Sequence, residues 1–382
     1  MKIAFVVHDY RRREGHSRYV VELATRFARE HEVHVFATEI EPDGNTKIHF
    51  HHVPAWRPNT LTGILTFVLM ATLRVRGEFD IIHNQGLCGV RGNVFTGHIC
   101  NRAWHRALRA ASGRLKFHEW VSGTTLSALE HLFYRTARRC KVIAVSRRLA
   151  GDLQRLYHCA APISTIYHGV DLAAFSPAAG SPIRAQVRRE CELNPQEMAF
   201  LFVGDMRKGG RQSIRALSKL RTGTLLFVSR SPVGAYRGLA AELGVEARVR
   251  FLGMTTQVEK YYAAADALLL PTHYDSFALV VTEAMASGLP VIVSREAGAA
   301  ELIHSGVDGL VLDDFNDWVE LGDKMRLLSE DRMLAQRMGT AARATVERYS
   351  WDETAAQTMR VYEELVGTRE AAVAVSSCST PQ

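Results

Sequence analysis

The sequence predicts an α/β protein made of two Rossmann-like domains that face a cleft. Three observations support this fold class. At 382 residues the chain is too long for one ordinary core. Short apolar segments alternate with helical segments in both halves, which is typical of parallel sheets covered on both faces. A stretch containing Pro and Ser at 174–182 separates the halves, and the alternation then restarts. Ligands of such sheets bind beyond the carboxyl ends of the strands, so the cleft is the expected site.

The predicted N-terminal domain covers residues 1–173. Its apolar runs predict buried strands, and amphipathic periodicity predicts helices at 18–30, 124–139 and 147–157. The predicted strands are Ile3–Val7, Val33–Ala37, Asp80–His83, Val94–Thr96, Lys141–Val145 and Ser164–Tyr167.

The predicted C-terminal domain covers residues 183–349 and repeats the pattern. A last helix is expected at 350–366, and 367–382 is expected to be a disordered tail. The predicted strands of this domain are Ala199–Val203, Leu225–Val228, Val249–Leu252, Ala267–Leu270 and Pro290–Val293.

Composition narrows the class of protein. The chain is 47% hydrophobic and 23% charged, as in soluble globular proteins. No apolar run reaches the ~18 residues that a transmembrane helix needs, and the N-terminus reads as a strand rather than a signal peptide. The six cysteines show neither paired spacing nor a metal-ligand pattern, so no metal is expected. A reduced, cytoplasmic protein is the resulting expectation.

The net charge of +7 is unevenly distributed. Residues 1–173 carry 24 Lys and Arg against 14 Asp and Glu, whereas the remainder carries 23 against 26. The basic half therefore predicts an anionic partner, either a membrane surface, a phosphorylated acceptor or nucleic acid. No nucleic-acid-binding module is recognisable, so nucleic acid is not expected.

The segment 271–303 carries the strongest functional pattern. Asp275 at a turn and Glu283 inside an apolar helix, together with free N–H groups at the helix start, predict a pocket that accepts an anion. The structural alternative is that Asp275 caps the helix and Glu283 is an ordinary acid on its surface. The apolar surroundings of Glu283 favour a ligand, because an unpaired buried carboxylate is costly.

Two other loops follow predicted strands. GDMRKGG at 204–210 combines glycines with Arg207 and Lys208, which suits a diphosphate, although a solvated basic turn is the alternative. Gly15 lies in the loop after the first strand, where a simple turn is the alternative. His98 follows the strand at 94–96, and a lone histidine is often structural.

These segments resemble the retaining glycosyltransferases of family 4 (glycosyl transferases group 1, GT-B fold) over roughly residues 1–366. His168-Gly169-Val170-Asp171 resembles the family's structural crossover. Three positions depart from the family pattern, since Asp275 replaces a glutamate, Glu14 replaces a glycine and Asp205 follows the strand glycine.

The resemblance implies a nucleotide-diphosphate sugar as donor and no obligatory cofactor. Glu283 would bind the ribose, Asp275 a sugar hydroxyl, and His98 would lie against the donor sugar. Gly15 would let the backbone approach the donor or acceptor. The resemblance also implies that the last helix packs back on the N-terminal domain. The leaving diphosphate would be stabilised by Arg207, Lys208 and the backbone of Phe277, Ala278 and Leu279.

The acceptor expected is a saccharide or a lipid-linked molecule of polysaccharide, lipopolysaccharide or glycolipid synthesis. The basic stripe Arg102, Arg106 and Arg109, beside Trp104, fits peripheral contact with an anionic membrane on its cytoplasmic face. A solvated charged face is the alternative. The alternatives to a transferase are a nucleotide-sugar epimerase on the same fold and a degenerate homologue that only binds.

Overall fold

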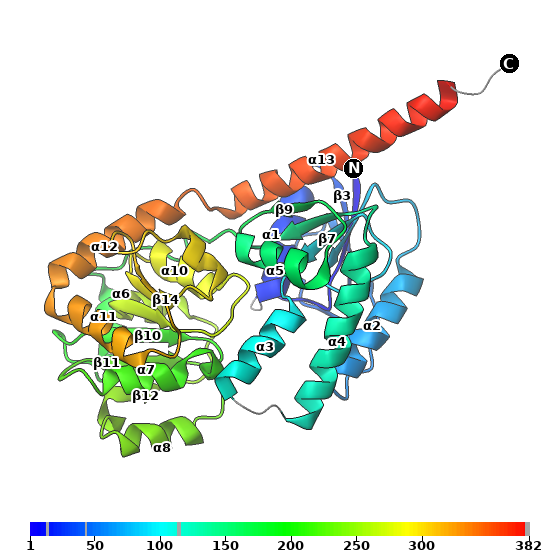
Figure 1. The fold of residues 1–382 in the computed structure, drawn as a ribbon. Coiled ribbons are helices and arrows are strands. Elements are labelled where there is room, and N and C mark those ends of the chain that lie inside the picture. The colour runs from blue at the N-terminus through cyan, green and yellow to red at the C-terminus, as the bar shows by residue number, and fades with distance from the viewer. Residues whose placement is uncertain (13–14, 43, 113–115, 379–382) are drawn as a thin grey trace. The chain divides into compact units, whose positions relative to one another are not determined.

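The computed structural model describes residues 1–12, 15–42, 44–112 and 116–378, with 112 and 369–378 described by backbone alone. The chain forms two compact units (Figure 1). The first comprises Met1–His105, Lys116–Gly169 and the chain from Trp351 onward. The second comprises Val170–Ser350 and a short stretch that begins at Arg106. The boundary between Gly169 and Val170 therefore precedes the predicted linker at 174–182.

The first unit contains a seven-stranded parallel sheet in the order β5-β3-β1-β6-β7-β8-β9. The predicted strands are present with small shifts of their ends, and β5 is an additional strand that the prediction missed. Two short strands, β2 (Asp9–Tyr10) and β4 (Glu39–Ile40), form a separate parallel pair. They follow β1 and β3 in the chain. The sheet strands are β1 (Lys2–Val6), β3 (Glu32–Ala37), β5 (Ile48–His52), β6 (Ile81–Gln85), β7 (Val94–Gly97), β8 (Lys141–Ala144) and β9 (Ile163–Thr165).

The helices of this unit cover the sheet. In α2 the side chains of Phe67 and Ala71 pack into a core with Ala4, Val6 and Phe36 of the strands. Burying these apolar side chains stabilises the fold by about 25 cal/mol for each Å² of apolar surface removed from water. The helices are α1 (Gly15–Phe27), α2 (Thr60–Arg74), α3 (Asn101–Ser112), α4 (Phe117–Thr136), α5 (Arg147–Tyr157) and α13 (Trp351–Cys378).

The C-terminal helix α13 belongs to the first unit and packs on α1. Trp351 is 2% exposed, and its ring contacts Tyr19 and His168 at centroid distances of 6.3 and 5.8 Å. The Thr354 hydroxyl donates to the Tyr167 carbonyl over 3.0 Å. The predicted tail begins at residue 367, whereas the backbone of α13 continues as a helix to Cys378. The stretch after 367 contains several alanines, which favour a helix. Residues 379–382 lie outside the described part.

The start of α3 is held by a buried acid. Glu130 of α4 is 4% exposed, and its carboxylate accepts hydrogen bonds from the Asn101 amide (2.9 Å), the Asn101 side chain (2.7 Å) and the Tyr157 hydroxyl (2.5 Å). Burial raises the pKa of Glu130 to about 7, although these donors oppose the rise. The carboxyl group therefore anchors the helix that follows His98 in the chain.

We expect Glu130 to make the fold less stable as the pH rises. Its folded pKa of about 7 exceeds the unfolded value of 4.5, so its contribution is fully favourable below pH 4.5 and is lost as the pH approaches 7. The free energy of unfolding of the wild type, minus that of Glu130→Gln, should fall by at least ~1 kcal/mol between about pH 5 and about pH 7.5. Urea unfolding at both pH values measures this difference, and an unchanged difference would contradict the assignment.

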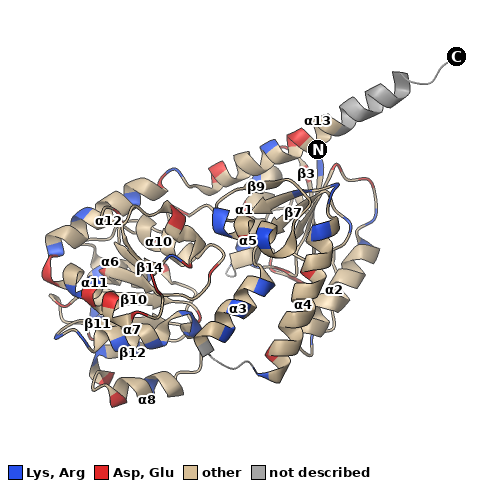
Figure 2. Cartoon of the chain, in the orientation of Figure 1, with Lys and Arg blue, Asp and Glu red and all other residues tan. Residues whose placement is uncertain are grey.

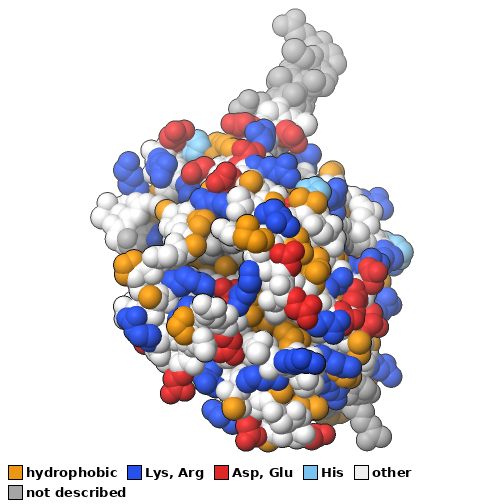
Figure 3. Space-filling view, turned by 90° about the vertical axis from the view of Figure 1, so that its left-hand side faces the viewer, with side chains coloured by type: hydrophobic (Ala, Val, Ile, Leu, Met, Phe, Trp, Pro, Cys, Tyr) orange, Lys and Arg blue, Asp and Glu red, His pale blue; other side chains and the backbone are white. Residues whose placement is uncertain are grey.

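The second unit contains a six-stranded parallel sheet in the order β12-β11-β10-β13-β14-β15. The predicted α/β class with two parallel-sheet domains is thus confirmed. On the face that Figure 3 shows, basic and acidic side chains are interspersed. The strands are β10 (Ala199–Val203), β11 (Thr224–Val228), β12 (Val249–Phe251), β13 (Ala267–Leu270), β14 (Val291–Ser294) and β15 (Leu310–Leu312). The α-helices are α6 (Pro182–Glu190), α7 (Gly210–Leu217), α8 (Gly234–Glu242), α9 (Glu259–Ala264), α10 (Leu279–Ala286), α11 (Trp318–Glu330) and α12 (Arg332–Val346).

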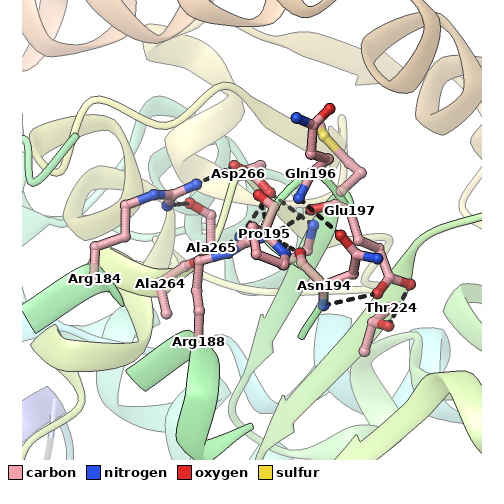
Figure 4. Close-up of polar contacts among 12 residues, drawn as sticks. Arg184, Arg188, Asn194, Pro195, Gln196, Glu197, Thr224, Ala264, Ala265 and Asp266 are labelled. Carbon is pink, nitrogen blue, oxygen red and sulfur yellow. Dashed lines mark hydrogen bonds and ion pairs between the residues drawn. The ribbon is translucent and has the colours of Figure 1, made fainter. Parts of the chain in front are cut away.

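An ion network ties α6 to the amino end of this sheet (Figure 4). Asp266, just before β13, accepts hydrogen bonds from Arg184 (2.5 Å), Arg188 (3.1 Å) and the Ala199 amide (2.8 Å). The Arg188 side chain is only 7% exposed. Buried charges need such partners, because desolvating an unpaired ion is costly. The network lies at the end of the strands opposite the predicted site.

Candidate functional site

In the first unit, His98 lies at the carboxyl end of β7 and is 5% exposed. Its Nε2 is 2.8 Å from Oε1 of Gln85, which ends β6. The rings of His16, Tyr19 and His168 surround it at centroid distances of 4.8, 5.2 and 5.5 Å. Residues from four separate segments therefore meet at the carboxyl edge of the sheet.

The environment of His98 favours the neutral imidazole. Burial lowers the pKa of His98 well below its ordinary value, and the neighbouring His16, His168 and His83 lower it further. A neutral ring can donate one hydrogen bond and accept another. It suits polar contact with an uncharged hydroxyl group better than contact with a phosphate.

Gly15 is the first residue of α1. The helix start is held by Ser17, whose hydroxyl donates to the Asp9 carbonyl and accepts from the Arg11 amide over 3.1 Å. The departure from the family at Glu14 lies outside the described residues. Gly15 and His16 thus place the start of α1 next to the His98 ring.

In the second unit, Lys208 and Asp275 meet across two strand ends. Lys208 ends a 3-10 turn, Met206–Lys208, after β10, and its Nζ is 2.7 Å from Oδ2 of Asp275, beyond β13. The two side chains are 29% and 15% exposed. Burial by itself would lower the pKa of Lys208, but the Asp275 carboxylate outweighs this effect and the pKa is raised. Lys208 is therefore a cation at neutral pH.

Gly209 allows this approach. Its φ of +113° suits glycine, and a Cβ there would lie 2.3 Å from the carbonyl oxygen of Pro271. Any side chain at 209 would push the Lys208 turn away from the segment that carries Asp275.

Arg207 is not directed at Asp275. Its guanidinium bonds Asp205 at 2.7 and 2.9 Å, and its side chain is 53% exposed. Asp205 also caps the 3-10 turn through the Arg207 amide (2.9 Å) and contacts the Ser231 hydroxyl (3.3 Å). Asp205, which departs from the family pattern, thus stabilises the turn and holds Arg207 in place.

The turn from Asp275 to Leu279 is tightly bonded. The Asp275 amide donates to Glu296 (3.0 Å), and the Phe277 amide donates to Oδ1 of Asp275 (3.2 Å). Ala278 has a φ of +74°, which is uncommon for a residue with a side chain and often marks a functional turn. Of the three amides predicted to meet a diphosphate, that of Phe277 is therefore already used within the turn.

Helix α10 begins at Leu279, after Ala278, without a side-chain cap. The N–H groups of a first helical turn have no acceptor within the helix, and the helix dipole favours an anion there. The amide of Leu279 thus belongs to a helix start that suits a phosphate oxygen.

Glu283 lies on α10 and is 7% exposed. Its carboxylate has a protein partner that the sequence did not indicate, because the buried Tyr262 hydroxyl donates to its Oε2 over 2.9 Å. A carboxylate has about four acceptor positions, so Tyr262 orients Glu283 without filling it.

The predicted membrane stripe on α3 is only partly free. The Arg102 guanidinium donates to the Leu156 carbonyl (2.7 Å) and lies over the Tyr157 ring (5.1 Å). Figure 2 shows basic residues on α3 in blue. Of the stripe, Arg106 and Arg109 are exposed. Within the described residues no helix is both long enough and apolar enough to cross a membrane.

Each unit of the chain matches a known protein family. Residues 13–174 match Glycosyltransferase Family 4, and residues 184–345 match Glycosyl transferases group 1. A D-inositol 3-phosphate glycosyltransferase from Salinispora arenicola is 32% identical over 84% of this chain and 78% of its own length. An uncharacterized glycosyltransferase from Methanocaldococcus jannaschii is 28% identical over 95% of this chain and 98% of its own.

Solved structures share the fold. WaaG, a glycosyltransferase involved in lipopolysaccharide biosynthesis, has a TM-score of 0.76 at 21% identity, covering 93% of this chain and 99% of its own. Sucrose-phosphate synthase from Thermosynechococcus elongatus has a TM-score of 0.78 at 22% identity, covering 96% and 99%. Anabaena HepE, solved with UDP and glucose, has a TM-score of 0.71 at 19% identity, covering 95% and 100%.

Proposed function

The chain belongs to the family 4, group 1 glycosyltransferases, and from this premise we propose that it is a retaining enzyme that moves a sugar from a nucleotide-diphosphate sugar to an acceptor hydroxyl. The observation that carries this proposal is the Lys208–Asp275 pair beside the uncapped start of α10. A fixed cation, a carboxylate and a helix start provide one partner each for a diphosphate, a sugar hydroxyl and a phosphate oxygen.

Lys208 is proposed to stabilise the charge that develops on the leaving diphosphate, with the Leu279 amide assisting. On donor binding, Lys208 would also contact the diphosphate, and Asp275 would also accept a hydrogen bond from a sugar hydroxyl. Arg207 is proposed to act at longer range from its exposed position on Asp205. The roles of Gly15 and His98, beside the donor sugar or the acceptor, remain those implied by the family.

Retention is proposed to follow from attack on the same face that the leaving group departs from. The departing phosphate would accept the proton of the acceptor hydroxyl, so no protein nucleophile takes part. In this scheme the protein positions the reactants and stabilises charge, and a neutral His98 adds a hydrogen bond without competing for the phosphate.

Glu283 is proposed to accept hydrogen bonds from the ribose hydroxyls of the donor. Hydrogen bonds to a charged group contribute about 1.5–3 kcal/mol, so Glu283→Gln should weaken nucleotide binding by about 10- to 100-fold. Titration calorimetry with nucleoside diphosphates measures this change. Glu259→Gln, an exposed acid on α9, is the matched control and should bind normally. Unchanged affinity in Glu283→Gln would remove Glu283 from the nucleotide site.

The reaction class is tested by following the donor with and without acceptor. A transferase releases nucleoside diphosphate in proportion to the glycosylated product. Without acceptor it releases nucleoside diphosphate only slowly, by transfer of the sugar to water. A nucleotide-sugar epimerase would instead convert the donor when no acceptor is present. Rapid acceptor-independent conversion of the sugar would contradict the proposal, and binding without any turnover in the presence of acceptor extracts would favour a degenerate homologue.

The acceptor is proposed to be a saccharide or a lipid-linked molecule, with the first unit in contact with an anionic membrane. Exposed apolar side chains on α2 and α4 support this contact better than α3 does. Between these helices a cavity of about 630 Å³ is lined mainly by apolar residues, with Arg138 and Arg139 among them. The exposed apolar residues are Leu65, Leu69, Leu73, Phe117, Trp120, Leu129 and Leu132.

Co-sedimentation with vesicles tests the membrane contact. Wild type should bind vesicles that contain phosphatidylglycerol, and Leu69→Gln combined with Leu132→Gln should reduce binding at least ~tenfold, because each buried leucine contributes about 1.5–3 kcal/mol. Met333→Gln, an exposed apolar residue of α12, is the control. Equal binding of the double variant and wild type would refute this surface.

A further inference from the structure

A cluster of histidines and one acid lies on the edge of the first sheet, away from the candidate site. Glu32 and His34 alternate with the buried Val33 and Val35 along β3, so they share the opposite face of that strand. His49 of the edge strand β5 is the register partner of His34. The three side chains therefore project from one face of two neighbouring strands.

The donor atoms of these side chains are close together. One ligand atom from each of Glu32, His34 and His49 lies within 4.8 Å of the others. The Nε2 of His34 is 2.9 Å from Oε1 of Glu32. The His34 and His49 rings stack at a centroid distance of 4.8 Å with an interplanar angle of 27°. Within the part of the chain that the structure describes, this is the group of His, Cys, Asp and Glu residues close enough to hold a metal ion.

We propose that Glu32, His34 and His49 form a binding site for a divalent transition-metal ion of the Zn²⁺ class. Two imidazoles and a carboxylate suit Zn²⁺, which takes His nitrogen at about 2.0–2.1 Å and carboxylate oxygen at about 2.0–2.2 Å. Mg²⁺ and Ca²⁺ prefer oxygen ligands, so this donor set disfavours them. Glu32 and His49 are exposed, which leaves a fourth position for water.

A second histidine orients the central ligand. The Nδ1 of His34 is 2.8 Å from Nε2 of His51, the next residue on the same face of β5. If His34 donates its Nδ1–H to His51, its Nε2, which lies 2.9 Å from Oε1 of Glu32, carries the lone pair that a metal ion needs. Metal-bound histidines commonly donate their other ring N–H to an outer acceptor, which fixes the tautomer and the ring orientation.

Lys2 competes for the same carboxylate. Its Nζ is 2.9 Å from Oε1 of Glu32 and lies 5.5 Å from the centre of the Phe79 ring. Lys2 therefore neutralises Glu32, and a bound ion would take over this role. Removing the ammonium should strengthen metal binding, which is a direction that a general loss of structure would not produce.

The location defines the effect of the ion. Glu32 and His34 begin β3, whereas His98 lies at the carboxyl end of β7, at the other end of the parallel strands. The ion would connect β3 with the edge strand β5 and thereby hold the edge of the sheet. The site is therefore structural and takes no part in sugar transfer.

Zinc titration of the full-length chain without a histidine tag tests the proposal. His49→Ala should weaken Zn²⁺ binding at this site at least ~tenfold, because even loss of an outer partner commonly costs 10- to 100-fold. His52→Ala, an exposed histidine on the opposite face of β5, is the matched control and should change affinity less than ~twofold. Lys2→Gln should bind Zn²⁺ more tightly than wild type.

Two further measurements distinguish this site from adventitious Zn²⁺ binding by other histidines. Zn²⁺ should raise the melting temperature of wild type and of His52→Ala, EDTA should reverse the rise, and Mg²⁺ should not produce it. Co²⁺ should give a visible absorption band in wild type that His49→Ala lacks. Equal Zn²⁺ affinity of wild type and His49→Ala, or equal losses in His49→Ala and His52→Ala, would overturn the proposal.

Discussion

Replacing Lys208 with alanine is expected to lower kcat by about 100- to 1,000-fold, which corresponds to the loss of one preorganised group that stabilises transition-state charge. Lys208 lies 2.7 Å from Asp275 and is held by a turn that only glycine at 209 permits. Its charge is thus fixed before the donor binds. Because the diphosphate gains negative charge as it leaves, the cation should act more on turnover than on donor affinity.

Steady-state kinetics and calorimetry together test this prediction. The donor Kd of Lys208→Ala should change less than kcat does, and a larger change in Kd would indicate ground-state binding instead. Arg207→Ala is the comparison variant, because Arg207 neighbours Lys208 but is 53% exposed, is paired with Asp205 and is proposed to act only at longer range. We expect Arg207→Ala to lower kcat by less than ~tenfold, since solvent and salt screen its exposed charge.

Apolar patterning predicted most of the two sheets and failed where the side chains were unusual. The strand β10 was predicted at its observed limits, 199–203, because every residue in it is apolar. β5 was missed because three of its five residues are histidines. The helix α2 was missed because its apolar residues surround the helix, and its sequence gives no single amphipathic face.

The candidate site depends on contacts between segments that are distant in the chain. The spacing of residues in the sequence does not reveal such contacts. Lys208 and Asp275 each follow a predicted strand, but only the order β10-β13 in the sheet makes them neighbours. The same is true of Tyr262, which no motif marked and which donates to Glu283. His168 was interpreted as part of a structural crossover, yet its ring lies 5.5 Å from that of His98. Pattern thus predicted the segments, and the fold determines their partners.

The ion network around Asp266 predicts the largest loss of stability. Asp266→Asn should lower the free energy of unfolding by about 3 kcal/mol, because it leaves the buried Arg188 guanidinium without its carboxylate. Urea unfolding monitored by circular dichroism measures the loss. Asp323→Asn is the control, since the Asp323–Arg326 pair is about half exposed on both sides and should contribute less than ~1 kcal/mol. Similar losses in both variants would show that Asp266 does not hold α6 to the sheet. Nucleotide affinity of folded Asp266→Asn should stay at the wild-type value, because this network and Lys208 lie at opposite ends of the parallel strands.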